Sequence, residues 1–219
     1  MTAFIITPDA GVIKSGNFES AFQGDTAAAD SLLVEQGAFL FSTGFLGIGA
    51  ALTATNAWKV TILGSLYAPQ GVGLILFSGN AKSSTITVAE EGSIHGGLDG
   101  MLVDSIATVR NYGMIFGETN GIRTAAEAGI RTILNYGSIS GGTHAIFDDF
   151  GVSTDRVTNA GEIVGNVDLS GGDDTLINTG LIQGDVHMGD GNNLLENTGL
   201  IDASSGGARG GNGVRRQII

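Results

Sequence analysis

The sequence predicts an all-β chain that folds as a single-domain, right-handed parallel β-solenoid of about nine coils, with 19–28 residues in each coil. Three observations lead to this prediction: a glycine recurs along the chain, apolar residues stand at fixed offsets from it, and asparagines repeat beside it. Each coil of a solenoid buries its apolar side only against the coils above and below. A repeat of about 20 residues is therefore typical of this architecture.

The recurring glycine is clearest in the C-terminal part of the chain. Residues 157–201 contain VTNAGEI, LINTGLI and LENTGLI, whose glycines are 19 residues apart. The same pattern extends to the N-terminus in weaker copies. The predicted coils are aligned on Gly16, Gly37, Gly64, Gly92, Gly113, Gly137, Gly161, Gly180 and Gly199. We expect each glycine to turn the chain between two short strands, because glycine accepts a positive φ at no steric cost.

Two positions around the glycine are apolar in every copy, although apolar residues make up only 42% of the chain. Side chains alternate between the two sides of a strand, so both positions can face the interior. Four residues before the glycine stand Val12, Leu33, Val60, Val88, Val109, Ile133, Val157, Leu176 and Leu195. Two residues after it stand Phe18, Phe39, Leu66, Ile94, Ile115, Ile139, Ile163, Ile182 and Ile201.

Asparagine occupies the position two residues before the glycine in the five C-terminal coils. These residues are Asn111, Asn135, Asn159, Asn178 and Asn197. A lone buried amide is costly, but in a column each amide can donate to one neighbour and accept from the other. The sequence therefore predicts an asparagine ladder next to Gly113, Gly137, Gly161, Gly180 and Gly199. Upstream the position holds Lys14, Glu35, Ile62 and Glu90, so no ladder is expected there.

The repeats run through most of the chain, which indicates one domain. We expect an N-terminal edge or cap at 1–11, the solenoid at 12–203 and a Gly-rich segment at 204–219. The chain has 37 glycines and only 2 prolines in 219 residues, a composition that suits a turn-rich β protein.

Charge and composition exclude several classes of function. The net charge of −12 argues against a nucleic-acid partner, because phosphate binding needs a basic surface. Cysteine is absent, so disulfides, thiolate metal sites and cysteine nucleophiles are excluded. The most apolar run, 38–52, is too short to span a bilayer, and we expect neither a transmembrane segment nor an N-terminal signal peptide.

Two glycine–aspartate turns carry the candidate ligand site. The segments SGGDDTL (170–176) and GDGNNLL (189–195) resemble the nonapeptide of hemolysin-type (RTX) repeats, which implies calcium as a ligand. At the 19-residue step Asp155, Asp174, Asn193 and Asn212 form one column, with Asp173 over Asn192 beside it. The candidate calcium ligands are Asp155, Asp173, Asp174, Asp190 and Asn193. The alternative is that these are solvated turns that bind no metal.

The wider repeat, over residues 105–202, is similar to those of bacterial autotransporter passengers and other large surface β-solenoid adhesins. This resemblance implies a non-enzymatic structural or adhesive protein, located outside the cell or on its surface. Its expected partners are further copies of itself, in fibres or a matrix layer, and cell-surface or matrix glycans. Export would use a route without an N-terminal signal peptide.

Two alternatives stay open at the level of sequence. One is a carbohydrate-active β-helix, such as a polysaccharide lyase or a tailspike-like hydrolase, which needs paired carboxylates. Asp148 and Asp149 are the one adjacent acidic pair outside the glycine turns, and their plain interpretation is an exposed loop. The other alternative is a fragment of a large calcium-binding secreted adhesin. Motifs of serine hydrolases, zinc proteases and P-loop proteins are absent, so we expect no enzymatic activity.

Overall fold

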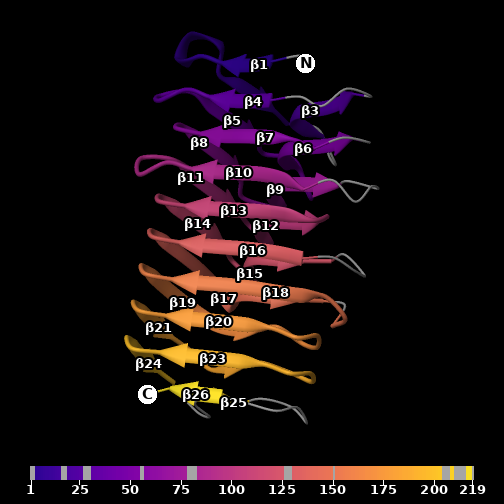
Figure 1. Ribbon diagram of the computed structural model, residues 1–219. Helices are drawn as coiled ribbons and strands as arrows, with labels where there is room; N and C mark the ends of the chain where they lie inside the picture. Colours follow the sequence, from indigo (N-terminus) through magenta and orange to yellow (C-terminus); the bar gives the residue numbers. More distant parts are fainter. Residues whose placement is uncertain are drawn as a thin grey trace.

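The computed structural model shows coils of parallel strands stacked along one axis, from the N-terminus at one end to the C-terminal strands at the other (Figure 1). It describes residues 3–15, 19–26, 31–54, 57–77, 83–125, 130–149, 151–203, 208–209 and 216–218. These residues form 26 strands and one short 3-10 helix, η1 (Pro8–Ala10). The predicted parallel β-solenoid is therefore confirmed. No helix able to cross a lipid bilayer occurs in the described part of the chain.

The first face of the solenoid is a ten-stranded parallel sheet in which each strand pairs with its counterpart one coil away. Nine of its strands match the nine predicted coils, and β26 adds a tenth. The strands are β1 (Ala3–Ile6), β4 (Ser31–Val34), β7 (Lys59–Ile62), β10 (Ser84–Val88), β13 (Ala107–Asn111), β16 (Ile130–Asn135), β18 (Thr154–Asn159), β20 (Thr175–Asn178), β23 (Leu194–Asn197) and β26 (Arg216–Ile218).

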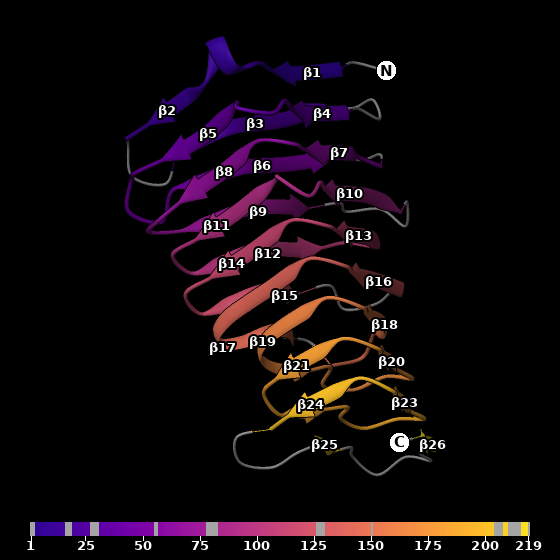
Figure 2. The ribbon, with the colours of Figure 1, turned by 90° about the vertical axis from the view of Figure 1, so that its left-hand side faces the viewer.

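The second face contains the strands that follow the glycine corner (Figure 2). They are β2 (Val12–Lys14), β5 (Phe39–Ser42), β8 (Ser65–Ala68), β11 (Ser93–Gly96), β14 (Met114–Gly117), the first parts of β17 (Ser138–Asp148) and β19 (Glu162–Asp168), β21 (Leu181–Gln183) and β24 (Leu200–Asp202).

The third face closes each coil. It contains β3 (Ser20–Thr26), β6 (Ile48–Ala54), β9 (Val72–Phe77), β12 (Asp99–Asp104), β15 (Asn120–Thr124), β22 (Val186–His187) and β25 (Ala208–Arg209). The second and third faces form a single 16-stranded sheet, because β17 and β19 run round the corner and pair on both faces.

Columns of apolar side chains fill most of the interior, and a few inward positions hold buried polar residues instead. In the register of the second face, Leu66, Ile94, Ile115, Ile139, Ile163, Ile182 and Ile201 stack on one another as predicted. On the first face Val109, Ile133, Val157, Leu176 and Leu195 form the matching column, also as predicted. One continuous core cluster joins these columns along the solenoid.

The predicted register is wrong in three of the first four coils. Leu32, not Leu33, stacks on Val60, and Ile86, not Val88, continues the column. The cause is the corner, which has two residues at 112–113 but four at 35–38 and at 89–92. The glycine therefore does not stand at a constant distance from the strand before it.

The first coil is also displaced from its predicted position. Val12 lies on the second face over Leu40, and Phe4 takes the place predicted for Val12 on the first face. Phe39 points outward and is 38% exposed. The predicted Gly16 and Phe18 lie outside the described residues.

The position of the asparagine ladder continues upstream with apolar residues. Ile6, Val34, Ile62 and Val88 stack in register above Asn111. The prediction of Ile62 is correct. Lys14, Glu35 and Glu90 were assigned to this column and lie elsewhere: Lys14 is in β2, and the two glutamates are in the four-residue corners.

Gly37 has the expected positive φ, of 78°, but the corner glycines from Gly64 onward are required for another reason. At Gly161 φ is not in the left-handed region, but an added Cβ would lie 2.2 Å from the carbonyl oxygen of Gly137 in the preceding coil. An added Cβ at Gly180 would come equally close to the carbonyl oxygen of Gly161, and one at Gly199 to that of Gly180. Glycine is needed here because two backbones come together at the corner.

We predict that Gly161→Ala destabilises the fold by about 2–4 kcal/mol, because backbone from two coils must separate to admit the methyl group. Urea unfolding followed by circular dichroism measures the change. The control is Ala160→Ser at the neighbouring exposed position, which is expected to change the free energy of unfolding by less than about 0.5 kcal/mol. Equal stabilities for the two variants would contradict this account of the corner.

Candidate functional site: the polar columns

The predicted asparagine ladder is present and runs through five coils. The Nδ2 atoms of Asn111, Asn135 and Asn159 each donate to Oδ1 of the next asparagine at 2.8 Å, and Asn178 donates to Asn197 at 2.7 Å. Asn111, Asn135, Asn159 and Asn178 are fully buried.

The second hydrogen of each amide ties the ladder to the next corner. Asn135 Nδ2 also donates to the carbonyl oxygen of Glu162 at 2.9 Å, and Asn159 Nδ2 to that of Leu181 at 3.0 Å. At the upstream end Asn111 Oδ1 is buried without a hydrogen-bond partner in the described part of the chain, because Val88 stands above it. The ladder thus links each strand of the first face to the second face of the following coil.

A second polar column follows the corner between the second and third faces. The register stacks Asp99, Asn120, His144 and Asn166. Asn120 Nδ2 donates to Asp99 Oδ1 at 2.8 Å, and His144 Nδ1 lies 3.3 Å from Asn120 Oδ1. Burial lowers the pKa of His144, with Asp168 acting in the opposite direction. This column could not be predicted from the sequence, because its members differ in type and their spacing varies.

The predicted calcium column lies at the corner between the third and first faces. Asp155, Asp174 and Asn193 are stacked there and buried. In this column a side chain accepts a hydrogen bond from the backbone of the preceding coil. Asp155 N–H donates to Asp174 Oδ1 at 2.8 Å, and Asp174 N–H donates to Asn193 Oδ1 at 2.9 Å. These three residues therefore fasten one coil to the next.

The other two candidate ligands lie outside this column. Asp173 and Asp190 are exposed on the turns. Asp173 Oδ1 accepts a hydrogen bond from Asn192 N–H at 2.8 Å, so here the backbone of the later coil donates to a side chain of the earlier coil. Asn212 lies outside the described residues.

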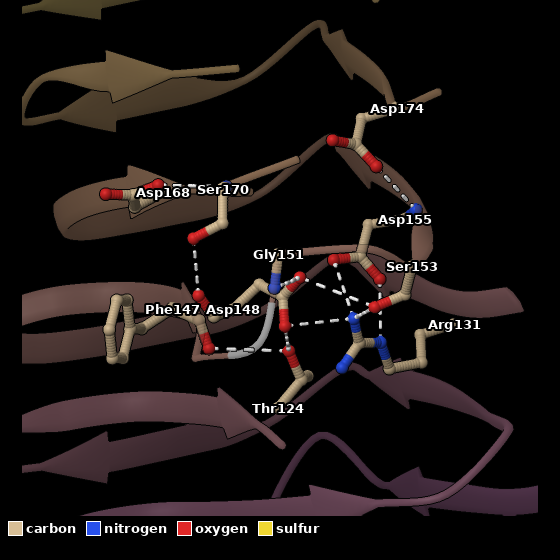
Figure 3. Close-up of polar contacts among 10 residues, drawn as sticks. All are labelled: Thr124, Arg131, Phe147, Asp148, Gly151, Ser153, Asp155, Asp168, Ser170 and Asp174. Carbon is tan, nitrogen blue, oxygen red and sulfur yellow. Dashed lines mark hydrogen bonds and ion pairs between the residues drawn. The ribbon is translucent and has the colours of Figure 1, made fainter. Parts of the chain in front are cut away.

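A buried charged cluster joins the N-terminal end of this column (Figure 3). Arg131, which is 2% exposed, contacts Asp155 through Nε at 2.8 Å and through Nη2 at 3.3 Å. Its Nη2 also lies 3.0 Å from Asp148 Oδ1 and donates to Ser153 Oγ. Asp148 is fully buried and accepts hydrogen bonds from Thr124 Oγ1 and Gly151 N–H.

The carboxylates of this cluster outnumber its one cation. Burial raises the pKa of Asp155 to about 6, although Arg131 opposes the shift. Burial also raises the pKa of Asp174 to about 7, with a further increase from the carboxylates of Asp155 and Asp148. Asp174 Oδ2 is buried and has no hydrogen-bond partner in the described part of the chain. Asp174 thus takes up a proton close to neutral pH.

The two residues of the acidic pair 148–149 lie in different environments. The exposed-loop interpretation is wrong for Asp148, which is fully buried. Asp149 is exposed and pairs with Arg123 at 3.2 Å. Asp148 is the last residue of β17, whereas Asp149 belongs to the bend that follows the strand. Arg131 was missed as well, since a single arginine carries no motif.

The arrangement can stabilise the stack, but it offers little to a ligand from solution. Among the described residues, no three acidic or histidine side chains converge closely enough to hold a metal ion. Calcium also accepts backbone carbonyl and amide oxygens as ligands. Calcium binding at the turns therefore stays a prediction, and Asp173 and Asp190 are the candidate ligands that reach solvent.

Comparisons with models of known protein families, with curated proteins and with solved structures find no match.

We predict that Asn159→Leu destabilises the fold by about 2–4 kcal/mol, because it leaves Asn135 Nδ2 and Asn178 Oδ1 buried without their partners. The matched variant is Asn111→Val at the end of the ladder. It breaks one amide contact instead of two, removes an unpaired oxygen and extends the apolar column of Val88. We expect it to cost less than half as much in urea unfolding. A larger loss for Asn111→Val would contradict the ladder as a stabilising unit.

We predict that the solenoid loses stability as pH rises from 5 to 8. The folded-state pKa values of Asp155 and Asp174 lie above the ordinary value of 3.8, so the folded state holds these protons more tightly than the unfolded state. This stabilisation is complete below about pH 4 and disappears as pH rises through about 6–7. Urea unfolding at a series of pH values measures the slope.

The variant Asp174→Asn tests the cause of that slope. It keeps an oxygen for Asp155 N–H, as Asn193 does naturally for Asp174 N–H. We expect it to gain about 1–2 kcal/mol over the wild type at pH 8 and nothing at pH 5. An unchanged slope would exclude Asp174 as the titrating group.

Proposed function

We propose that this protein is a non-enzymatic structural or adhesive β-solenoid that self-associates end to end into fibres. The observation that carries the proposal is the partial exposure of the inward side chains in the first coil. The inward residues of that coil, Phe4, Ile6, Val12 and Phe22, pack on the core but stay partly exposed. Their counterparts one coil below, Leu32, Val34, Leu40 and Ala50, are between 0% and 1% exposed.

The backbone at this end supports the same proposal. Among the described strands β1 pairs with β4 alone, so its other edge can template a further parallel strand. Glu35 N–H donates to the carbonyl of Ile6, and the groups of successive residues in a strand point to opposite sides. The N–H of Ile5 is therefore directed away from β4, towards an added coil.

We propose a second copy of the chain as the added coil. The opposite end of the first face is β26, so β26 of one copy would continue the sheet above β1 of the next. Such a head-to-tail contact does not close on itself and generates filaments. A position outside the cell or on its surface rests on the resemblance of the repeats to surface adhesins.

The absence of enzymatic activity is part of the proposal. The charged groups around Arg131 are sealed from solvent, at most 4% exposed, so a substrate could not reach them. The carbohydrate-active alternative has one observation in its favour. The register of the third face places Arg123, Phe147, Asp168 and His187 in one outward column, and His187 Nδ1 lies 3.7 Å from Asp168 Oδ2. Release of reducing sugars from polysaccharides would favour that alternative.

The test is Ile5→Pro, examined by negative-stain electron microscopy in calcium and in a chelator. Proline removes the N–H that faces the open edge but no hydrogen bond to β4. We expect fibres of wild-type protein, and end-to-end association weakened at least about tenfold by the variant. The control is Ile5→Thr, which keeps the N–H at the same half-exposed position, and circular dichroism verifies that both variants fold.

Short single rods of the wild-type protein in both conditions would contradict end-to-end assembly. Fibres in both conditions would indicate that the apolar coil end is sufficient. Fibres only in calcium would connect the Asp173 and Asp190 turns to assembly, and Asp173→Asn would then abolish them.

A further inference from the structure

An exposed stripe of mainly aromatic residues runs along the second face. The register places Ile13, Phe41, Tyr67, His95 and Phe116 in one outward column over five consecutive coils, and we call this column the aromatic stripe. Ile13 is 61% exposed and Tyr67 39%. Phe39 and Met114, in the neighbouring outward column, are 38% and 44% exposed.

The rings of the stripe are held by one another. The ring centroids are 5.2 Å apart for Phe41 and Tyr67, 4.4 Å for Tyr67 and His95, and 4.7 Å for His95 and Phe116. Neighbouring planes are tilted by about 41–42°. The two inner rings, Tyr67 and His95, thus each have a neighbouring ring on either side with centroids at most 5.2 Å away, and the ring edges remain for a partner.

The stripe carries no acidic side chain, although the chain has a net charge of −12. Burial lowers the pKa of His95, against the effect of nearby Glu118, so the imidazole is neutral at physiological pH. On the C-terminal part of the same face Glu162 and Asp202 are exposed. A second molecule of this acidic protein therefore meets little charge repulsion at the stripe.

We propose that the aromatic stripe is a docking surface for a second copy of this chain, packed flank to flank about a two-fold axis close to Tyr67. Two arguments select this partner. The stripe of the second copy has the same coil spacing of about 4.8 Å, so the side chains of the two stripes interdigitate along their length. A two-fold contact brings the same patch of both molecules together, and edges of aromatic rings pack well against each other. A saccharide would need open ring faces, which the inner rings do not offer.

This flank contact is distinct from the end-to-end contact, and together the two would gather fibres into bundles. The experiment uses the full chain with Ile5→Pro, so that end-to-end growth does not obscure the result. In that background Tyr67→Glu with Phe116→Glu places two charges in the stripe. The matched control, Val164→Glu with Gln183→Glu, places two charges in the same outward column further along the face.

We expect the Ile5→Pro chain and its matched control to form dimers in sedimentation analysis, and the stripe variant to dissociate at least about tenfold more readily. A covalent probe is also available, because the chain has no cysteine. Under oxidation Tyr67→Cys should give a disulfide-linked dimer, whereas Gln183→Cys should stay monomeric.

Three results would overturn the proposal: monomers at concentrations on the order of 100 µM, equal dimerisation of the stripe variant and the control, or retention of a monomer on cellulose that depends on Tyr67 and Phe116. The last result would assign the stripe to glycans. Because Ile5→Pro acts only on the coil end, a negative result for the flank contact does not change the outcome of the fibre experiment.

Discussion

The solenoid depends on placing each residue directly over its counterpart in the next coil. This register brings backbone together so closely at the corners that only glycine fits between the coils around Gly137, Gly161 and Gly180. It also means that a polar group in the interior is costly unless a neighbouring coil supplies its hydrogen-bond partner. Every inward position is therefore a column whose members must be compatible with one another.

Apolar and amide columns satisfy this requirement, but a column of charges does not. Asparagine combines a donor and an acceptor, so each added amide completes the one before it. Aspartate has only acceptors when ionised, and stacked carboxylates repel one another. The protein accommodates Asp155 and Asp174 by using backbone N–H groups as donors, by burying Arg131 against them, and by raised pKa values that favour the proton-bound form. At position 193 the column holds asparagine instead of aspartate, and its amide carries no charge.

The sequence was sufficient for the fold class and for the asparagine ladder, because both repeat at nearly constant steps in the C-terminal coils. It failed in the N-terminal coils, where four-residue corners shift the glycine relative to the preceding strand while the glycine itself remains. The pairing of Arg131 with Asp148 could not be predicted either. These residues lie at the two ends of one coil, in β16 and β17, and Arg131 occupies the register position of Asp155 without sharing its residue type. The turn aspartates were correctly grouped by their spacing, but spacing does not indicate which oxygens are already occupied.

The asparagine ladder also gives the solenoid a dipole along its axis. All four amide contacts run the same way, each Nδ2 pointing to the C-terminal neighbour, so the amide dipoles add along the axis and polarise one another. The two ends of this array are unlike. A bare oxygen at Asn111 is buried beneath the apolar N-terminal coils, while the other end lies close to the C-terminal edge. Two rods joined tail to tail would oppose these dipoles, whereas rods joined in one direction would align them.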